Sequence, residues 1–284
     1  MRPAAETSFG ERVRDAVGAL GPLCVGIDPS KALLGAYGLQ DDAQGLASFG
    51  EICVDALRGV AAVVKPQVAF FERHGASGLS AFEQVVALAS DAGMLVIADA
   101  KRGDIGSTTE AYADAWFRGP LAADAVTATA YVGVGALFPM VRAARATGRG
   151  LLVIVTSSNP EGREVQEAVV PDGRTVEESV LGALSRWNAE ELGTAGGDSL
   201  GSVGAVVGAT GATAPEGLGD LAGVVLAPGL GAQGATVADV VRRFAHLAPR
   251  SVLPAASRGL LSAGPEGLRS AASRLRDELS AALP

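Results

Sequence analysis

The sequence predicts an α/β fold in which eight parallel strands, each followed by a helix, close into a (β/α)8 TIM barrel. Short apolar runs alternate with longer segments whose apolar residues recur at helical spacing, as repeated strand–helix units require. The runs are apolar throughout rather than alternating, which is typical of strands buried on both faces of a parallel sheet. An open, doubly wound sheet is the structural alternative.

The chain length of 284 residues exceeds that of a typical single domain, but α/β barrels of about 200 to 250 residues often form one unit. Hydrophobic residues make up 48% of the chain, which is enough for a large core. No linker or low-complexity tract interrupts the pattern. We therefore expect a single domain over residues 1–284, with an N-terminal helix before the first strand.

The expected strands follow one another along the chain as short apolar runs. They lie at residues 23–27, 62–65, 95–99, 125–128, 151–155, 204–208, 223–226 and 251–253. Between them, apolar residues return at the spacing of one helix face. The clearest helices are expected at residues 46–60, 79–92, 176–192 and 236–247. The segment 159–174, a long connection after the fifth strand, contains Pro, Asp and Gly, and the sequence does not decide whether it forms a hairpin.

Charge and cysteine content limit the environment and the partners of the chain. The formal net charge of -8 argues against a nucleic-acid or anionic-membrane surface, because such surfaces need clustered Lys and Arg. No apolar run reaches transmembrane length, and the N-terminal residues lack the apolar core of a signal peptide. Cys24 and Cys53 lie in apolar stretches, where a free cysteine usually acts as a small buried hydrophobe. We expect a cytoplasmic protein without nucleic-acid or membrane partners.

Lysine is scarce in this chain, which has three lysines against 20 arginines. Lys65 and Lys101 lie in apolar, strand-like runs close to carboxylates, whereas Lys31 has no evident role. Arginine cannot release its proton near neutral pH, but a lysine ammonium has a pKa that responds to burial and neighbours, and it can donate a proton. Lys65 and Lys101 therefore indicate a candidate site.

Charged residues gather where the strands are expected to end, which in a barrel is the face that carries active sites. They are Asp28, Lys65, Asp99, Lys101 and Asp104. If the third strand continues to Lys101, its period of two puts Asp99 and Lys101 on one face, and Gly103 lets the chain turn afterwards. An isolated pair of this kind is usually a surface ion pair of little energetic value. The second scarce lysine at the end of the neighbouring strand favours a functional site.

A glycine-rich segment, Pro228 to Gly234, follows the seventh strand and precedes a helix that is expected to begin near Thr236. Glycines allow backbone N–H groups to approach an anion, and a helix N-terminus adds partial positive charge. Barrels commonly bind phosphate with the loops after the seventh and eighth strands, and Arg258 lies in the second of these loops. The pattern predicts a small phosphorylated substrate.

Taken together, these motifs resemble the orotidine 5'-phosphate decarboxylase family, particularly its longer bacterial branch. The resemblance rests on Asp-x-Lys-x-x-Asp-Ile from Asp99 to Ile105, on Lys65-Pro66 upstream and on the segment PGLGAQG downstream. It implies a homodimeric barrel that converts orotidine 5'-phosphate to uridine 5'-phosphate and CO2 in pyrimidine biosynthesis. It also implies that no metal ion or organic cofactor is needed.

The resemblance assigns roles to individual residues. Lys65, Asp99, Lys101 and Asp104 match the family's alternating charged array, with Lys101 as the proton donor to C6 of the pyrimidine. Asp104 is expected to enter the site of the partner subunit, accompanied by Ile105 and Thr108. The expected substrate-binding residues are Asp28 and Lys65 for the ribose, Ser158 or its neighbour Ser157 for the pyrimidine, and Gln233 and Arg258 for the phosphate.

Two alternative functions use a similar sequence pattern. Metal-dependent sugar-phosphate decarboxylases, hexulose-phosphate synthases or aldolases of the same barrel superfamily hold a cation partly through an acidic residue at the end of the second strand. Lys65 occupies that position here and disfavours a cation. A non-catalytic protein that binds nucleotide phosphates would keep the glycine-rich loop and Arg258, but it would not require the charged array.

Overall fold

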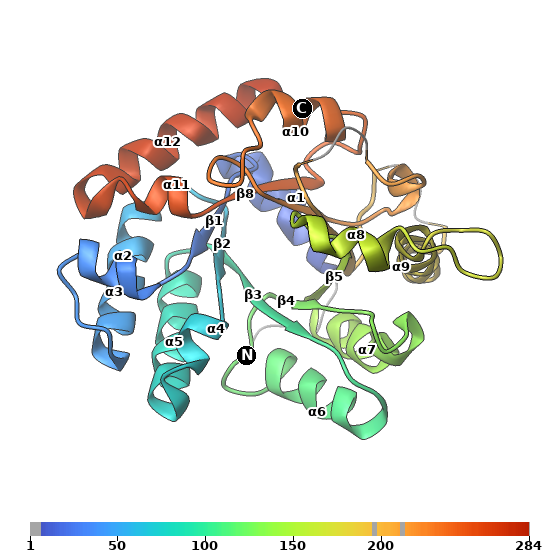
Figure 1. Cartoon of the computed structure of the whole chain (residues 1–284), viewed down its shortest axis with the longest axis horizontal. Coiled ribbons are helices and arrows are strands. Elements are labelled where there is room, and N and C mark those ends of the chain that lie inside the picture. The colour runs from blue at the N-terminus through green and yellow to red at the C-terminus, as the bar shows by residue number, and fades with distance from the viewer. Residues whose placement is uncertain (1–6, 195–197, 211–213, 284) are drawn as a thin grey trace.

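The computed structural model, which describes residues 7–194, 198–210 and 214–283, confirms the predicted barrel. Eight parallel strands pair in the order of the chain, and the first pairs with the eighth to close the barrel (Figure 1). The strands are β1 (Cys24–Ile27), β2 (Val63–Pro66), β3 (Leu95–Arg102), β4 (Ala125–Ala128), β5 (Gly150–Thr156), β6 (Val203–Val207), β7 (Val225–Pro228) and β8 (Val252–Ala256).

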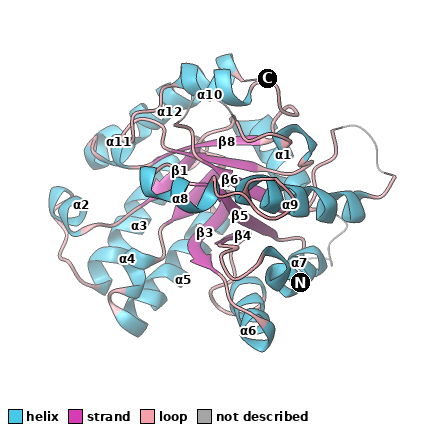
Figure 2. Ribbon diagram, turned by 45° about the vertical axis from the view of Figure 1, so that its right-hand side comes forward, coloured by secondary structure: helices cyan, strands magenta, loops and turns pink. Residues whose placement is uncertain are grey.

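Helices surround the closed sheet on its outer side (Figure 2). The α-helices are α1 (Phe9–Leu20), α2 (Lys31–Ala36), α3 (Ala43–Leu57), α4 (Ala69–Glu72), α5 (Gly75–Asp91), α6 (Gly106–Phe117), α7 (Phe138–Thr147), α8 (Arg163–Gln166), α9 (Val176–Leu192), α10 (Val237–Phe244), α11 (Arg258–Leu261) and α12 (Gly264–Ala282). Short 3-10 helices are η1 (Val134–Leu137), η2 (Pro160–Gly162) and η3 (Leu218–Asp220).

Strand ends differ from the sequence prediction where pairing with a neighbour extends or shifts the strand. The prediction of 125–128 for β4 is confirmed. β3 continues three residues beyond the predicted end at 99, and Arg102 pairs with Ala128 after a break in register. β7 begins two residues later than predicted, and β8 continues to Ala256, where it pairs with Val25 of β1. These ends depend on partners that are distant in sequence.

The segment 159–174, left open by the sequence, forms η2, the short helix α8 and a tight hairpin. Val169 and Thr175 form an antiparallel bridge, and the Val170 N–H donates to the Arg174 carbonyl at 2.8 Å around the turn. The side chain of Val169 is 70% exposed at this hairpin. The connection therefore has its own local structure and lies on the surface.

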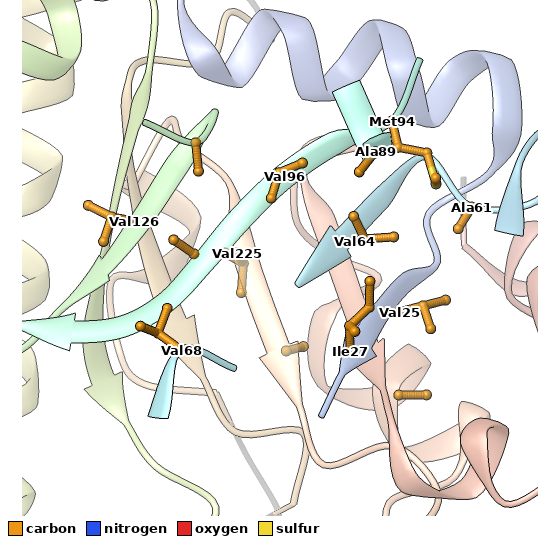
Figure 3. Close-up of a cluster of buried hydrophobic side chains, with 14 of the residues drawn as sticks. Val25, Ile27, Ala61, Val64, Val68, Ala89, Met94, Val96, Val126 and Val225 are labelled. Carbon is orange, nitrogen blue, oxygen red and sulfur yellow. The ribbon is translucent and has the colours of Figure 1, made fainter. Parts of the chain in front are cut away.

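The larger part of the hydrophobic core fills the space between the strands and the surrounding helices. Figure 3 shows outward-pointing side chains of this layer, among them Val64 of β2, Val96 of β3 and Val126 of β4, with Ala89 of α5 nearby. All four are fully buried or nearly so. This packing buries the outer face of the parallel sheet, which explains why its strands are apolar on both faces.

A second hydrophobic cluster fills the interior of the barrel. The inward-facing strand residues include Cys24, Val63, Ile97, Ala125 and Leu152. Helix α1 closes the end of the barrel where the strands begin, because Phe9, Val13 and Val17 join the same cluster. Gly150 at the start of β5 provides room for this helix, since a Cβ atom there would lie 2.3 Å from the Phe9 ring. The interior is thus apolar at its N-terminal end.

Both cysteines are buried with free thiols, as expected from their apolar surroundings. Burial raises the pKa of Cys24 to about 12, so this thiol stays protonated near neutral pH. None of the helices in the described ranges is both long enough and apolar enough to span a membrane.

Replacement of Phe9 by Ala tests the closure of the barrel by α1. The Phe9 ring is fully buried, so its removal is expected to lower the free energy of unfolding by about 3 to 5 kcal/mol, measured by urea denaturation. Phe138→Ala is the control. The Phe138 side chain is 36% exposed on α7, so its removal should lower the free energy of unfolding clearly less. Equal losses would contradict this account of α1.

Candidate active site

A pocket opens at the C-terminal ends of the strands and brings seven of the predicted site residues together. Its walls come from loops and strand ends all around the barrel. The predicted residues that line it are Asp28, Lys65, Asp99, Lys101, Ser158, Gln233 and Arg258. Residues from β1 to β8 therefore converge on one site, as the closed barrel requires.

The floor of the pocket is a polar layer directly above the apolar interior of the barrel. Lys65, Asp99 and Thr127 each lie two residues beyond an inward-facing apolar residue of the same strand, so all three point inward. Their burial is nearly complete, with exposed fractions of 7%, 8% and 1%. The barrel thus holds charged groups at its centre, where water screens them little.

The Asp99 carboxylate is the centre of this layer. Its Oδ2 atom accepts a hydrogen bond from Lys65 Nζ at 2.7 Å, and its Oδ1 atom accepts one from Lys101 Nζ at 2.6 Å. The Lys101 side chain remains 49% exposed, so its ammonium group lies on the pocket side of the pair. One carboxylate therefore bonds both of the scarce lysines that the sequence singled out.

Burial and charge act in opposite directions on these groups. Burial alone would raise the pKa of Asp99, but the Lys65 and Lys101 charges outweigh it and hold that pKa well below its ordinary value. Burial would likewise lower the pKa of Lys65, but the carboxylates of Asp99 and Asp28 raise it above its ordinary value. Both Asp99 and Lys65 therefore remain charged near neutral pH.

Two further residues bond Asp99 and were not predicted from the sequence. Gln67 Nε2 donates to Asp99 Oδ2 at 3.1 Å, and the Thr127 hydroxyl donates to Asp99 Oδ1 at 2.9 Å. Gln67 lies just beyond β2, two residues after Lys65 and therefore on the same side of the extended chain, which was the available signal. Thr127 was a single hydroxyl residue within an apolar strand, a pattern with no functional meaning by itself.

Lys101 has an unusual backbone conformation for a residue that is not glycine, with φ of 49°. Its N–H does not continue the regular strand ladder but donates to Thr127 Oγ1 at 2.9 Å. The pairing of β3 with β4 breaks between Ala98 and Arg102, so the break covers this residue. Backbone strain of this kind persists only where the surroundings hold it, and it is frequent at functional sites.

Asp28, just beyond β1, lines the pocket on the side of Lys65, and one of its oxygen atoms has no hydrogen bond among the described residues. The Ser257 hydroxyl donates to Asp28 Oδ2, while Asp28 Oδ1 is buried without a hydrogen-bond partner among the described residues. Ser257 lies beside Arg258, at the end of β8. An unpaired carboxylate oxygen in a pocket wall is an acceptor for a ligand hydroxyl group.

The two candidate serines after β5 differ in their contacts. The Ser157 N–H donates to Gln166 Oε1 at 3.1 Å, and Gln166 Nε2 donates to the Ser157 hydroxyl at 3.0 Å. Ser158 also lines the pocket, and none of the side-chain hydrogen bonds found for the described residues engages its hydroxyl group. Ser158 is therefore the more available of the two to a ligand.

The glycine-rich loop lines the pocket, but the helix after it does not. Gly229, Gly231 and Gly234 all have positive φ values, so the loop turns tightly beside Gln233. The N-terminus of α10 is capped by Thr236 and Asp239, and neither residue lines the pocket. The capping box bonds the N–H groups of Thr236 and Asp239, and the expected contribution of this helix N-terminus to anion binding stays a prediction.

Three predicted residues lie outside the pocket of the single chain. Asp104 does not join the Asp99 cluster, and its Oδ1 atom accepts the N–H of the next residue, Ile105, at 2.8 Å. Ile105 is 61% exposed, and Thr108 is exposed on the first turn of α6. The chain turns away from the pocket after β3, where Ile105 and Thr108 are exposed and Asp104 is half-buried.

Replacement of Asp99 by Asn tests the charge balance of the site. A charged, buried Lys65 would lose its closest counter-charge, so the free energy of unfolding should fall by about 3 to 5 kcal/mol at pH 7. Folding lowers the pKa of Asp99, so its ionised carboxylate stabilises the folded state at pH values above its unfolded pKa of about 3.9. This stabilisation declines as the pH falls below that value. Urea denaturation should therefore show a smaller difference in the free energy of unfolding between the wild-type chain and Asp99→Asn at about pH 3 than at pH 7. An equal gap at both pH values would contradict this account.

Comparison with known proteins gives matches over nearly the whole chain. The model of the "Orotidine 5'-phosphate decarboxylase / HUMPS family" matches residues 21–273. A curated orotidine 5'-phosphate decarboxylase from Salinispora arenicola is 49% identical over 280 residues, which are 97% of this chain and 98% of the relative.

Solved structures agree with the sequence matches. A Streptomyces avermitilis protein, provisionally named as the same enzyme, has a TM-score of 0.90 at 47% identity and covers 100% of this chain and 98% of its own. The OMP decarboxylase of Leishmania donovani has a TM-score of 0.74 at 30% identity, with coverage of 97% and 98%. The motif resemblance seen in the sequence is thereby confirmed, and the chain belongs to the orotidine 5'-phosphate decarboxylase / HUMPS family.

Proposed function

We propose that this protein decarboxylates orotidine 5'-phosphate to uridine 5'-phosphate and CO2, a step of pyrimidine nucleotide biosynthesis. The observation that carries the proposal is the buried Asp99 carboxylate between the ammonium groups of Lys65 and Lys101. This cluster lies in a pocket that also contains a glycine-rich loop and Arg258. Curated relatives that match nearly the whole chain have the same activity in their names.

The reaction requires fixed positive charge next to C6 of the pyrimidine. When the bond from C6 to the carboxylate breaks, CO2 leaves and the electron pair stays on C6, where the ring delocalises it poorly. A preorganised ammonium group stabilises this charge without reorganisation of solvent. Lys101 Nζ supplies that group and then transfers a proton to C6, a step that an arginine side chain cannot perform.

Asp99 and Lys65 prepare Lys101 for this step. Asp99 remains ionised because its pKa is lowered, so it orients the Lys101 ammonium group through the bond to Oδ1. Lys65 balances the second carboxylate oxygen and lies near Asp28. Asp28 and Lys65 then bind the ribose hydroxyl groups, a role supported by the unpaired Oδ1 atom of Asp28.

The remaining pocket residues hold the two ends of the substrate. Arg258 is exposed at the rim, next to the glycine-rich loop and Gln233, and these residues bind the phosphate. Ser158 binds the amide edge of the pyrimidine, since its hydroxyl is less engaged than that of Ser157. Binding energy from the phosphate helps to hold the pyrimidine against Lys101.

We infer a homodimer in which Asp104 of each chain completes the site of the other. Asp104, Ile105 and Thr108 face away from their own pocket. Apolar side chains on the same side of the barrel are unusually exposed, including Tyr131 at 82% and Val132 at 50% on the loop after β4. Exposed apolar groups of this size are typical of a protein interface.

We also place the reaction in the cytoplasm, where thiols stay reduced. The two buried, free cysteines support this location.

An assay of the purified protein with EDTA tests the activity and the role of Lys101. The wild-type chain should convert orotidine 5'-phosphate to uridine 5'-phosphate. The reaction is measured as the decrease in the ultraviolet absorbance of the orotate ring. Lys101→Ala should lower kcat by about four orders of magnitude, because it removes both the electrostatic and the proton-transfer contribution. Lys31→Ala is the control, since Lys31 is exposed and lies outside the pocket. No turnover by the wild-type chain, or dependence on a metal ion, would disprove the proposed function.

Mixing of two inactive variants tests the shared site. Lys101→Ala and Asp104→Ala should each be nearly inactive alone. Equal amounts, unfolded and refolded together, should form mixed dimers in which one of the two sites is complete. About a quarter of the wild-type activity per chain is then expected, because half of the dimers are mixed. The same treatment of each variant alone is the control, and no recovery in the mixture would disprove a site shared across the interface.

A further inference from the structure

We propose that Thr127 is a positioning residue for Lys101, an inference that rests on the proposed decarboxylation. Thr127 lies on β4 at the floor of the pocket and is 1% exposed. Its hydroxyl group makes two bonds at once: it accepts from the Lys101 N–H at 2.9 Å and donates to Asp99 Oδ1 at 2.9 Å. A single side chain thus connects the backbone of the proton donor to the carboxylate that orients its ammonium group.

The strand pairing shows why this connection is needed. Along β3 and β4, Ala98 pairs with Val126, and the next pair is Arg102 with Ala128. Three residues of β3, from Asp99 to Lys101, therefore lie opposite Thr127 alone. The regular backbone ladder is interrupted over the two residues on which the proposed chemistry depends, and the Thr127 side chain replaces the missing ladder bond.

The interruption leaves Lys101 in a strained conformation, with φ of 49°. A lysine in this left-handed region returns to the extended conformation unless its surroundings hold it. The bond from its N–H to Thr127 provides that restraint from a buried, rigid strand. The direction in which the Lys101 side chain leaves the backbone therefore depends on Thr127.

The hydroxyl group makes both bonds because it is a donor and an acceptor at the same time. Valine has the same shape but neither function, so Thr127→Val leaves the Lys101 N–H and one bond of the Asp99 carboxylate unsatisfied. Serine keeps the hydroxyl group and loses only a methyl group. The two substitutions therefore separate hydrogen bonding from packing.

Loss of the Thr127 bonds should affect kcat rather than KM, because the residues that bind the ribose and the phosphate lie on other strands and loops. Asp28 belongs to the end of β1, Gln233 to the loop after β7 and Arg258 to the loop after β8, so these substrate contacts do not depend on Thr127. Lys65 is held by Asp99 Oδ2, the oxygen atom that Thr127 does not contact. A misplaced Lys101 ammonium group affects the chemical step instead. A displacement of about 1 Å of a reacting group is enough to lower a rate by about two orders of magnitude.

The test compares Thr127→Val, Thr127→Ser and the wild-type chain in steady-state kinetics with orotidine 5'-phosphate. Thr127→Val should lower kcat by about 100-fold, with KM and the inhibition constant of uridine 5'-phosphate within about threefold of wild type. Thr127→Ser should retain at least about a third of wild-type kcat. Thr109→Val is the control, because Thr109 is a fully buried threonine on α6 whose hydroxyl has no hydrogen-bond partner among the described residues. It should leave kcat unchanged.

Three outcomes would overturn the inference. The first is an unchanged, wild-type kcat in Thr127→Val. The second is a fall in kcat together with weaker binding of uridine 5'-phosphate and a lower melting temperature, because that combination indicates a general structural role. A crystal structure of Thr127→Val gives a readout that does not depend on activity: Lys101 should leave its positive φ, and an unchanged φ would also overturn the inference. Inactivity of the wild-type chain would instead disprove the proposed function.

Discussion

The buried carboxylate of Asp99 is the constraint on which the site depends. A carboxylate removed from water is unstable unless opposite charges and hydrogen bonds compensate it, and here four donors do so, from Lys65, Gln67, Lys101 and Thr127. These donors come from β2, the residue after it, β3 and β4, so the charge balance holds three neighbouring strands in one arrangement. In the proposed reaction, the same interaction fixes the ammonium group that must face C6 of the pyrimidine.

The barrel supplies the two environments that this arrangement needs. Below the polar layer, the interior is apolar and closed by α1, which keeps water from entering from that end. Above it, the strand ends open into the pocket, where Lys101 remains half-exposed and available to a ligand. Low dielectric on one side strengthens the interactions of Asp99 and Lys65, and access on the other side allows exchange of substrate and product.

The tasks that we propose for the site are divided among separate strands. Proton transfer depends on β2 to β4, whereas the phosphate grip comes from the loops after β7 and β8, across the pocket. Asp28 lies between these regions and is bonded by Ser257, the residue before Arg258. This separation allows distant parts of the substrate to supply binding energy while the strained segment around Lys101 supplies the chemistry.

The sequence by itself determined the fold class, the order of the strands and most of the residues that meet in the pocket. Apolar runs and helical spacing are local patterns, and parallel strands carry their polar ends to one face whatever the details of packing. Scarce lysines beside Asp99 were likewise visible in the chain. Only the tertiary structure decided that Gln67 and Thr127 bond this carboxylate and that Lys101 adopts a positive φ. These features depend on the bridge between Gln67 and Asp99 and on the break in register between β3 and β4, which arise from pairing between segments that no sequence period relates.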